Sequence, residues 1–261
     1  VLAPDRVPRR LTTLSQQLEL FDELRVDQVA ILDFDDALRH LPAEAFVTEV
    51  LVDALAAAVV SVGEDFRFGY RQQGDCALLA RMGAAHGFQL APVAIVGDGE
   101  GAFTASDVRD ALADGDLGAA GRILGRRFAV RGVVVRGDGR GRAIGFPTAN
   151  LRLVEAQALP RRGVYAVWVR VGDGVLPGVA NIGVRPTFDG TAEVLEAHLL
   201  DVADRPEGEG IDLYDQVVDV EFVSRIRDEQ RFDGVESLVA QIGADVAEAR
   251  ARLDQDAGSS G

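Results

Sequence analysis

The run GVYAVWVRVG at residues 163–172 decides the fold class of the second half of the chain. β-branched and aromatic residues fill it and glycines bound it, which is the composition of a short β-strand. The same texture recurs, with turn residues in between, in RFAVRGVVVRG (127–137), LPGVANIG (176–183), VLEAHLLD (194–201) and QVVDVEFVSRI (216–226). One segment of helical periodicity follows at residues 234–253. We therefore predict an all-β antiparallel barrel or sandwich with a C-terminal helix.

The first half of the chain, from residue 11 to about 121, alternates between helical and strand-like patterns. Helices are predicted for TTLSQQLELFDELR (12–25), LPAEAFVTEVLVDAL (41–55) and GDCALLARMGAAHG (74–87). Short strands or extended runs are predicted for DQVAILDF (27–34), AAVVSVG (57–63) and FQLAPVAIV (88–96). Such alternation is typical of an α/β unit with a parallel sheet. The unit opens in the loop-like residues 3–10 and offers few strands, so we expect its front end to be missing.

Composition narrows the class of protein. In 261 residues no apolar run reaches the ~18 residues of a membrane span, and the N-terminus lacks a secretory pattern. The single cysteine, Cys76, excludes an internal disulfide. We therefore expect a soluble, cytoplasmic protein. A net charge of −15 argues against nucleic acid as a partner.

The positive charge is unevenly distributed. All 27 basic residues are arginine, and seven of them fall between Arg122 and Arg142 against one acid. Such an island fits a small polyanion such as a nucleotide, although a solvated arginine-rich surface explains it equally well. Without lysine, a Walker-A phosphate loop is excluded.

A glycine-rich loop follows in the same region, where glycines alternate with charged residues. Glycine lets the backbone approach a ligand and aim N–H groups at phosphate oxygens, and arginine offers forked donors to the same oxygens. A mobile hairpin tip is the alternative explanation. The predicted phosphate-binding residues are Gly137, Asp138, Gly139, Arg140, Gly141 and Arg142.

The stretch AIGFPTAN (143–150) places two polar side chains directly behind a proline. Pro147 stiffens the backbone, and the two-residue spacing puts Thr148 and Asn150 on one face of an extended segment. A simpler interpretation of this stretch is an exposed strand on which both residues face water. A rigid hydroxyl beside a phosphate loop is, however, a sensible ligand for Mg²⁺, which prefers oxygen donors.

Six motifs in this order resemble a known family. The riboflavin kinase domain of bacterial bifunctional riboflavin kinase/FAD synthetases is similar in the glycine-rich loop and in GFPTAN, GVYAVWV, GVANIGVRPTF, LEAHLLD and RIRDEQRFDGVESLVAQI. The upstream half resembles the later part of that enzyme's FMN adenylyltransferase domain, in residues 10–35, 44–51 and 62–69. The resemblance implies an incomplete Rossmann-like nucleotidyltransferase domain at 1–121 and a riboflavin kinase domain at 124–254. From their position at the end of the chain, residues 255–261 are expected to be a disordered tail.

The resemblance also implies roles for individual residues. Thr148 and Asn150 would bind the Mg²⁺ and phosphates of ATP, and Glu196 would act as base toward the ribityl 5′-hydroxyl of riboflavin. Arg227 and Asp228 would contact the flavin. For His198, two residues beyond Glu196, we expect a supporting hydrogen bond rather than catalysis.

The upstream half departs from the family pattern. The family's H-x-G-H motif is absent, since the three histidines, His40, His86 and His198, are never paired at that spacing. Residues that match the remaining adenylyltransferase motifs are Asp65 and Phe66 in GEDFRFG and Arg109 in TASDVR, where Ala105 replaces a family serine. We therefore expect riboflavin, FMN, ATP and ADP as ligands but no adenylyl transfer by this chain.

Three functional hypotheses follow. The first is riboflavin phosphorylation by the barrel with Mg-ATP; the second is a complete bifunctional FAD synthetase. The third is a catalytically silent flavin- or nucleotide-binding module, which is favoured if Glu196 or Thr148 points into the core and disfavoured if both line one cavity with the glycine loop. A barrel that binds single-stranded nucleic acid needs aromatic platforms, and one Trp with three Tyr on an acidic chain argues against it.

Overall fold

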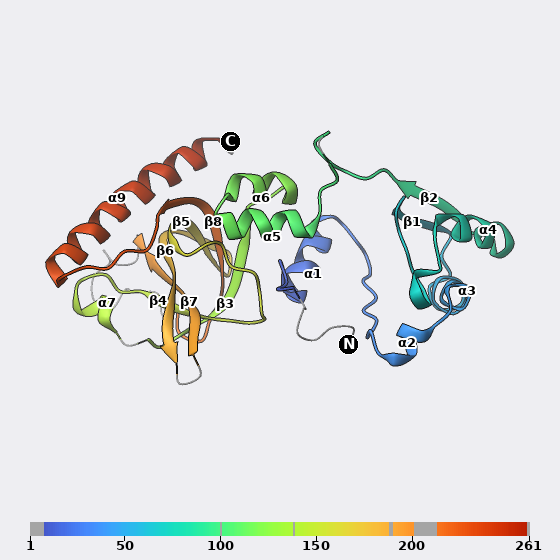
Figure 1. Ribbon diagram of the computed structural model, residues 1–261, viewed down its shortest axis with the longest axis horizontal. Helices are drawn as coiled ribbons and strands as arrows, with labels where there is room; N and C mark the ends of the chain where they lie inside the picture. The colour runs from blue at the N-terminus through green and yellow to red at the C-terminus, as the bar shows by residue number, and fades with distance from the viewer. Residues whose placement is uncertain (1–7, 100, 138, 188–189, 201–212, 260–261) are drawn as a thin grey trace. The chain divides into compact units, whose positions relative to one another are not determined.

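A computed structural model describes residues 8–99, 101–137, 139–187, 190–200 and 213–259. Contacts between residues divide it into two compact units (Figure 1). The described part of the small unit is Arg25–Phe103, and the large unit combines Pro8–Leu24 with the chain from Thr104 onward. No helix in the described ranges is both long enough and apolar enough to cross a lipid bilayer.

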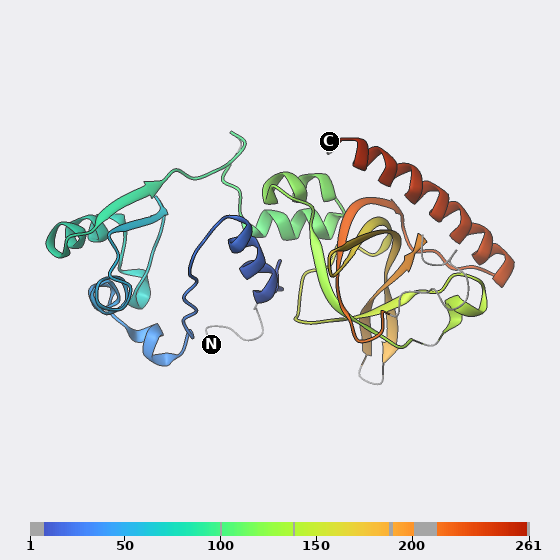
Figure 2. The same cartoon turned by 180° about the vertical axis from the view of Figure 1, so that it is seen from behind.

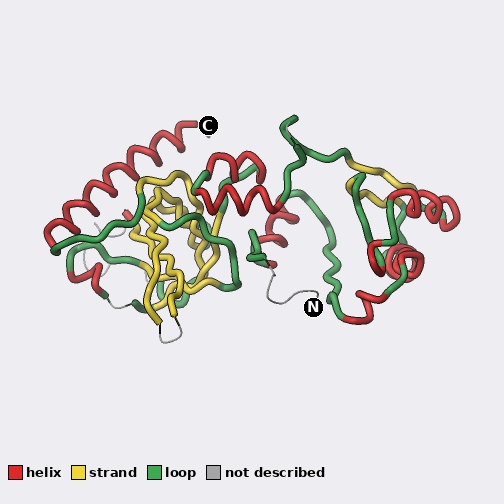
Figure 3. Tube along the Cα trace, in the orientation of Figure 1, coloured by secondary structure: helices red, strands yellow, loops and turns green. Residues whose placement is uncertain are grey.

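The large unit is built on a closed barrel. Its strands are β3 (Ala129–Val135), β4 (Ala149–Leu153), β5 (Gly163–Val171), β6 (Gly174–Thr187), β7 (Gly190–Leu199) and β8 (Val217–Arg227). They follow the order β3-β4-β7-β6-β5-β8, β8 pairs back onto β3, and every pair is antiparallel. Figure 3 draws these strands in yellow. The predicted antiparallel barrel is therefore confirmed.

Alternation along the strands fills the barrel interior. In β8, Val218, Val220 and Phe222 are buried, while the acids between them stay partly exposed. The Phe222 ring meets Tyr165 of β5 edge-on, with ring centroids 5.2 Å apart. Each such side chain contributes roughly 1.5–3 kcal/mol by leaving water.

Helix α9 (Val235–Ser259) lies along the outside of the barrel (Figure 2). Its inner face buries Ala249 and Leu253 against Ala166 of β5. Near its end the Asp256 carboxylate accepts hydrogen bonds from Arg127 and from Trp168 Nε1, each at 2.8 Å. Helix α9 extends to Ser259, so residues 255–259 of the tail predicted to be disordered at 255–261 are helical; residues 260–261 lie outside the described part.

Three helices before the barrel belong to the large unit: α1 (Leu14–Glu23), α5 (Ala105–Asp114) and α6 (Leu117–Leu124). Val108, Leu112 and Ala120 on α5 and α6 are at most 1% exposed and join the hydrophobic cluster of the barrel. The compact units therefore do not follow the boundary predicted at residues 121–124. An amphipathic helix shows in sequence that one face is buried, but not against which partner it packs.

Helix α1 is attached to the barrel through a buried polar network. Thr13 caps the helix by accepting from the N–H of Gln16, which forms a capping box with it. Arg131 of β3 donates to both Glu19 oxygens at 2.6 Å and, through Nε, to Asp219 of β8 at 2.9 Å. These hydrogen bonds lower the pKa of Glu19 below its ordinary value, because they favour the charged carboxylate.

The small unit contains a two-stranded parallel sheet of β1 (Val59–Gly63) and β2 (Gln89–Val93). Around it lie α2 (Asp36–His40), α3 (Ala43–Ala45), the π-helical segment η2 (Phe46–Ala54), the 3₁₀ turn η3 (Tyr70–Gln72) and α4 (Cys76–His86). Val47, Phe68, Leu79 and Phe88 are among its core residues. The predicted α/β character is confirmed.

One predicted strand of the small unit is wrong. Residues 27–34 form no strand, and Ile31 and Phe34 are 59% and 56% exposed. A short apolar run becomes a strand only where a neighbouring strand satisfies its backbone hydrogen bonds, and within the described residues β1 pairs only with β2.

Candidate functional site

A row of polar residues crosses the barrel at one end. Asn150 of β4 lies directly opposite Glu196 of β7, and Glu196 lies directly opposite Asn181 of β6. Asn181 is in turn opposite Val164 of β5, which faces Arg227 at the end of β8. Directly opposed residues share one face of a sheet, so the register of five strands assembles this row from distant parts of the sequence.

Four members of the row, Glu196, Asn181, Val164 and Arg227, line a pocket of about 340 Å³ in the large unit, whereas Asn150 does not line it. Glu196 and Thr148 both line it together with Gly141. Polar and apolar groups are mixed around the cavity, and its further lining residues are Ile144, Phe146, Val164, Val179, Asn181, His198, Arg227, Glu229, Gln230, Phe232, Leu238, Ile242 and Asp245. The structure therefore brings the predicted base and one predicted Mg²⁺ ligand into a single cavity.

The glycine-rich loop packs against both predicted metal ligands. A Cβ atom at Gly137 would collide with the Asn150 side chain, and one at Gly141 would lie 3.2 Å from Thr148 Oγ1. Arg140–Ala143 form the short helix α7 within this loop. Asp138 lies outside the described residues, as do the side chains of Arg140 and Arg142. Only glycine permits this close approach of the loop to the strand.

Gly137→Ala tests this packing. The added methyl group would displace the Asn150 amide, and we expect kcat/KM for ATP to fall at least about tenfold, since small misplacements of positioning groups are costly. Steady-state kinetics with varied ATP measures the effect. Gly243→Ala on α9 is the control, because nothing lies within 4 Å of a Cβ there. Equal kinetics for the two variants would contradict the role of the close approach.

His198 supports the turn that presents Thr148. Its Nδ1–H donates to the Pro147 carbonyl at 2.8 Å, and its ring meets Phe146 edge-on with centroids 5.4 Å apart. The residue is 7% exposed. This agrees with the expected supporting hydrogen bond.

Arg227 and Asp228, both predicted to contact flavin, point to different places. Arg227 lines the pocket and forms an ion pair with Asp245 of α9 at 2.7 Å. Asp228 does not line it; its side chain is 68% exposed and pairs with Arg225 and Arg161. The hydrogen bond from Arg225 holds the pKa of Asp228 below its ordinary value.

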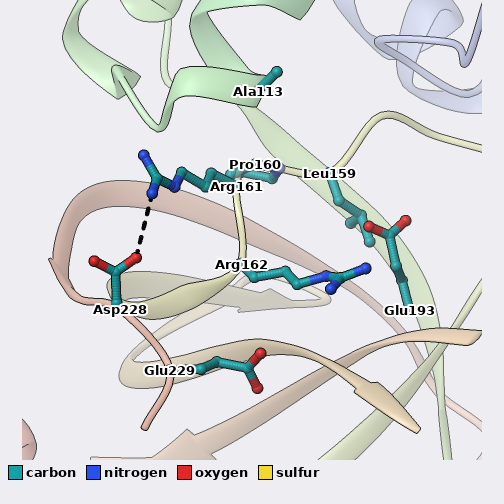
Figure 4. A pocket seen from close by; sticks show the side chains of 8 residues that line it. All are labelled: Ala113, Leu159, Pro160, Arg161, Arg162, Glu193, Asp228 and Glu229. Atoms are coloured by element: carbon teal, nitrogen blue, oxygen red, sulfur yellow. Dashed lines mark ion pairs between the residues drawn. The ribbon is translucent and has the colours of Figure 1, made fainter. Parts of the chain in front are cut away.

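Asp228 instead lines a neighbouring pocket of about 520 Å³ (Figure 4). There the Arg162 side chain extends between Glu193 and Glu229, and the dashed line marks the Arg161–Asp228 pair. Glu229 lines both pockets, so it stands between them.

The arginine island does not act as one cationic surface. Arg131 donates hydrogen bonds to the carboxylates of Glu19 and Asp219. These bonds favour the charged guanidinium and raise the pKa of Arg131 above its ordinary value. Arg127 pairs with Asp256 and, at 3.8 Å, with Glu221. The expectation of a shared anion site over residues 122–142 is wrong for these two arginines, because acids on neighbouring elements neutralise them.

The adenylyltransferase residues fall into different units. Asp65 and Phe66 follow β1 in the small unit, where both are exposed and the Phe66 ring stacks on Phe68 with centroids 5.5 Å apart. Arg109 lies on α5 in the large unit and donates to the Arg9 and Ala105 carbonyls at 2.8 and 3.0 Å. Within neither unit do the three residues form one site.

Sequence reasoning missed several residues at the pocket. Asn181 stands in the apolar run VANIG, where a lone amide on a strand is a usable signal. Arg185 of β6 donates to Glu196 Oε1 at 3.2 Å. Asp245 is an acid among the apolar positions of a helix, which is a usable signal, whereas Glu229 lies in a charged loop and carries no such signal.

The closed barrel, its flanking helix and its partly polar pocket define a barrel domain with a small-molecule site, and comparison with known proteins identifies its family. The riboflavin kinase family matches residues 124–253, and the FAD synthetase family matches residues 1–106. The bifunctional riboflavin kinase/FMN adenylyltransferase of Escherichia coli K12 is 43% identical over 251 residues, which cover 96% of this chain and 78% of that protein. The chain belongs to the family of bifunctional riboflavin kinase/FMN adenylyltransferases.

Further relatives support the assignment. The Haemophilus influenzae protein of the same name is 37% identical over 94% of this chain and 77% of its own length. Among solved structures, one described as a macrolide-efflux protein from Streptococcus pneumoniae superposes with a TM-score of 0.82 and 29% identity, over 95% of this chain and 79% of that one. The chain thus shares its fold with an experimental structure.

Proposed function

We propose that the large unit is a riboflavin kinase that transfers the γ-phosphoryl group of Mg-ATP to the 5′-hydroxyl of riboflavin, giving FMN and ADP. The observation that carries this proposal is that Glu196 and Thr148 line one pocket together with Gly141. This arrangement argues against a silent binding module, which would not require a carboxylate and a hydroxyl to converge beside a glycine-rich loop.

Glu196 is the base in this proposal. Its carboxylate accepts the proton of the 5′-hydroxyl as the oxygen attacks the γ-phosphorus and the bond to the β–γ bridging oxygen breaks. Arg185, which donates to Glu196 Oε1 at 3.2 Å, holds the carboxylate in place. Asn150 and Asn181 lie on either side of Glu196, each directly opposite it on a neighbouring strand. Their amide groups are suited to form hydrogen bonds with the ribityl chain or with a phosphate oxygen.

Thr148 and Asn150 are the residues suited to hold the Mg²⁺ that accompanies ATP. Both offer neutral oxygens, and Mg²⁺ takes few protein ligands besides phosphate oxygens. The described residues contain no cluster of three His, Cys, Asp or Glu, so they offer no separate acidic cage. When bound, the ion would neutralise charge on the transferred phosphoryl group.

The apolar lining residues of the pocket suit the flavin ring. Ile144, Val164, Val179, Phe232 and Ile242 line the cavity together with polar groups. A planar ring with a polar tail matches a cavity whose lining combines apolar side chains with hydrogen-bonding groups.

Adenylyl transfer is a second candidate, which the FAD synthetase match over residues 1–106 favours. The chain lacks paired histidines in an H-x-G-H motif, and Arg109 contacts main-chain carbonyls of the large unit. We therefore propose that this chain forms FMN and stops there.

Product chromatography tests both proposals. The protein is incubated with riboflavin and Mg-ATP, and flavins are separated over time. FMN as the only product is the expected result. FMN followed by FAD would overturn the proposed loss of adenylyl transfer, and neither product with flavin still bound would favour the silent module.

A further inference from the structure

Asp245 is a buried acid on the apolar stripe of helix α9. It is 3% exposed and lies at helical spacing from Leu238, Ile242 and Ala249. A carboxylate at such a position needs partners, because an unpaired buried charge is costly. Both oxygens are engaged: Oδ1 accepts from Arg227 Nε at 2.8 Å and Gln241 Nε2 at 2.9 Å, and Oδ2 accepts from Arg227 Nη2 at 2.7 Å.

Arg227 joins this acid to the loop beside the pocket. Two of its N–H groups form the forked pair with Asp245, and Nη1 donates to the Asp228 carbonyl at 2.9 Å. Its guanidinium carbon lies 5.9 Å from the centre of the Phe232 ring. A guanidinium has five N–H donors, and within the described residues three of those of Arg227 form these hydrogen bonds, which leaves two that can face a ligand. One side chain therefore links helix α9, the end of β8 and residues 228–232.

We propose that Asp245 is a positioning residue for the flavin: it fixes Arg227, and through it the loop with Phe232, as one rigid wall of the pocket. The inference rests on the proposed riboflavin kinase function. A neutral side chain at 245 leaves the guanidinium without its forked anchor, and a mobile wall must be ordered each time the ligand binds. Ordering on binding weakens affinity without altering the groups at the reacting atoms.

Asp245→Asn keeps the size of the side chain and removes its charge. We expect the riboflavin Kd and KM to rise about ten- to a hundredfold, the range for losing a hydrogen bond to a charged group. The kcat should stay within about threefold, because the lost riboflavin binding energy is the same in the ground state and in the transition state. The KM for ATP should not change. Riboflavin titration, followed by quenching of flavin fluorescence, and steady-state kinetics measure these quantities.

Asp256→Asn is the matched control. Asp256 lies on the same helix and also accepts from an arginine through both oxygens, at 2.8 Å from Arg127 Nη2, but it does not line the pocket. We expect its riboflavin KM to equal that of the unmodified protein. A similar KM increase in both variants would show that helix stability alone matters and would overturn the proposal.

A double variant separates positioning from independent contacts. Arg227→Gln breaks the same pair from the strand side, and the combination with Asp245→Asn should be no worse than Arg227→Gln alone. Additive effects would contradict action through Arg227. If Asp245→Asn does not fold, Arg227→Gln replaces it in the test. The same increase in riboflavin KM is then expected, and an unchanged riboflavin KM would overturn the proposal.

The two proposals fail differently. An unmodified protein that makes no FMN refutes the proposed function, whereas riboflavin Kd needs no turnover and still reports the effect of Asp245→Asn. A protein that makes FMN with an Asp245→Asn riboflavin Kd within twofold of the unmodified value refutes the positioning role alone.

Discussion

Glu196→Gln is expected to lower kcat for FMN formation by about 10²- to 10⁴-fold, the usual contribution of a positioned general base. The amide keeps the shape of the side chain and can still accept from Arg185, which donates to Glu196 Oε1 at 3.2 Å. It cannot take the proton of the riboflavin hydroxyl. Binding of Mg-ATP should remain largely intact, because the glycine-rich loop, which we propose binds the phosphates, is unaltered. Single-turnover kinetics and ATP titration measure the two effects separately.

Glu193→Gln provides the control on the same strand. Glu193 pairs with Arg9 and lines the neighbouring pocket instead of the one that contains Glu196. Its replacement should leave kcat unchanged. Loss of ATP binding in parallel with kcat in Glu196→Gln would count against its role as the base.

Arg131→Met is expected to destabilise the large unit by about 3 kcal/mol or more, since breaking a buried ion pair leaves an uncompensated charge. The Arg131 and Asp219 side chains are only 10% and 13% exposed. Met roughly fills the space of the arginine stem but satisfies neither Asp219 nor Glu19. Trp168 is the only tryptophan and lies on β5, so its fluorescence during urea unfolding reports on this unit.

Arg170→Gln is the corresponding surface control. Arg170 donates to Glu221 at 2.8 Å with a side chain that is 49% exposed, so its loss should cost at most about 1 kcal/mol. Similar costs for the two variants would contradict a special role of the Arg131 network in holding α1 to the barrel.

The effect of Arg131→Met should shrink in acid. Arg131 lowers the pKa of Glu19 in the folded chain below its ordinary value of 4.5. The stabilisation is therefore complete above pH 4.5 and is lost as the pH falls through the lower folded value. Below pH 4.5 the difference in unfolding free energy between the variant and the unmodified protein should therefore narrow by the contribution of Glu19, which is small because its side chain is 60% exposed. A difference that grows in acid would contradict this linkage.

The barrel strands were predictable because period-two alternation and Gly, Pro or Asp boundaries are local properties of the sequence. The run at 27–34 shows the limit of that rule, since its apolar residues match a strand but pairing depends on a neighbour elsewhere. That α5 belongs to the large unit was equally unpredictable from the sequence. Val108 and Leu112 indicate that one face of the helix is buried, but not that this face packs on the barrel.

The site was predictable only in part, for a related reason. Thr148 and Glu196 were assigned through resemblance, and no spacing rule joins residues on β4 and β7. Strand register does so, by placing Asn150 opposite Glu196. Asp245 carried a local signal, an acid among the apolar positions Leu238, Ile242 and Ala249, but its arginine partner is set by how α9 packs on the barrel.

The most direct test of the account is a crystal structure of the protein with riboflavin and Mg-ADP. If Glu196 is the base, the ribityl 5′-oxygen lies within about 3.2 Å of a Glu196 carboxylate oxygen, the reach of a general base, with the ADP phosphates beside Thr148 and the glycine-rich loop. A flavin bound outside this pocket, or a Glu196 side chain turned away from the 5′-oxygen in the bound complex, would contradict it.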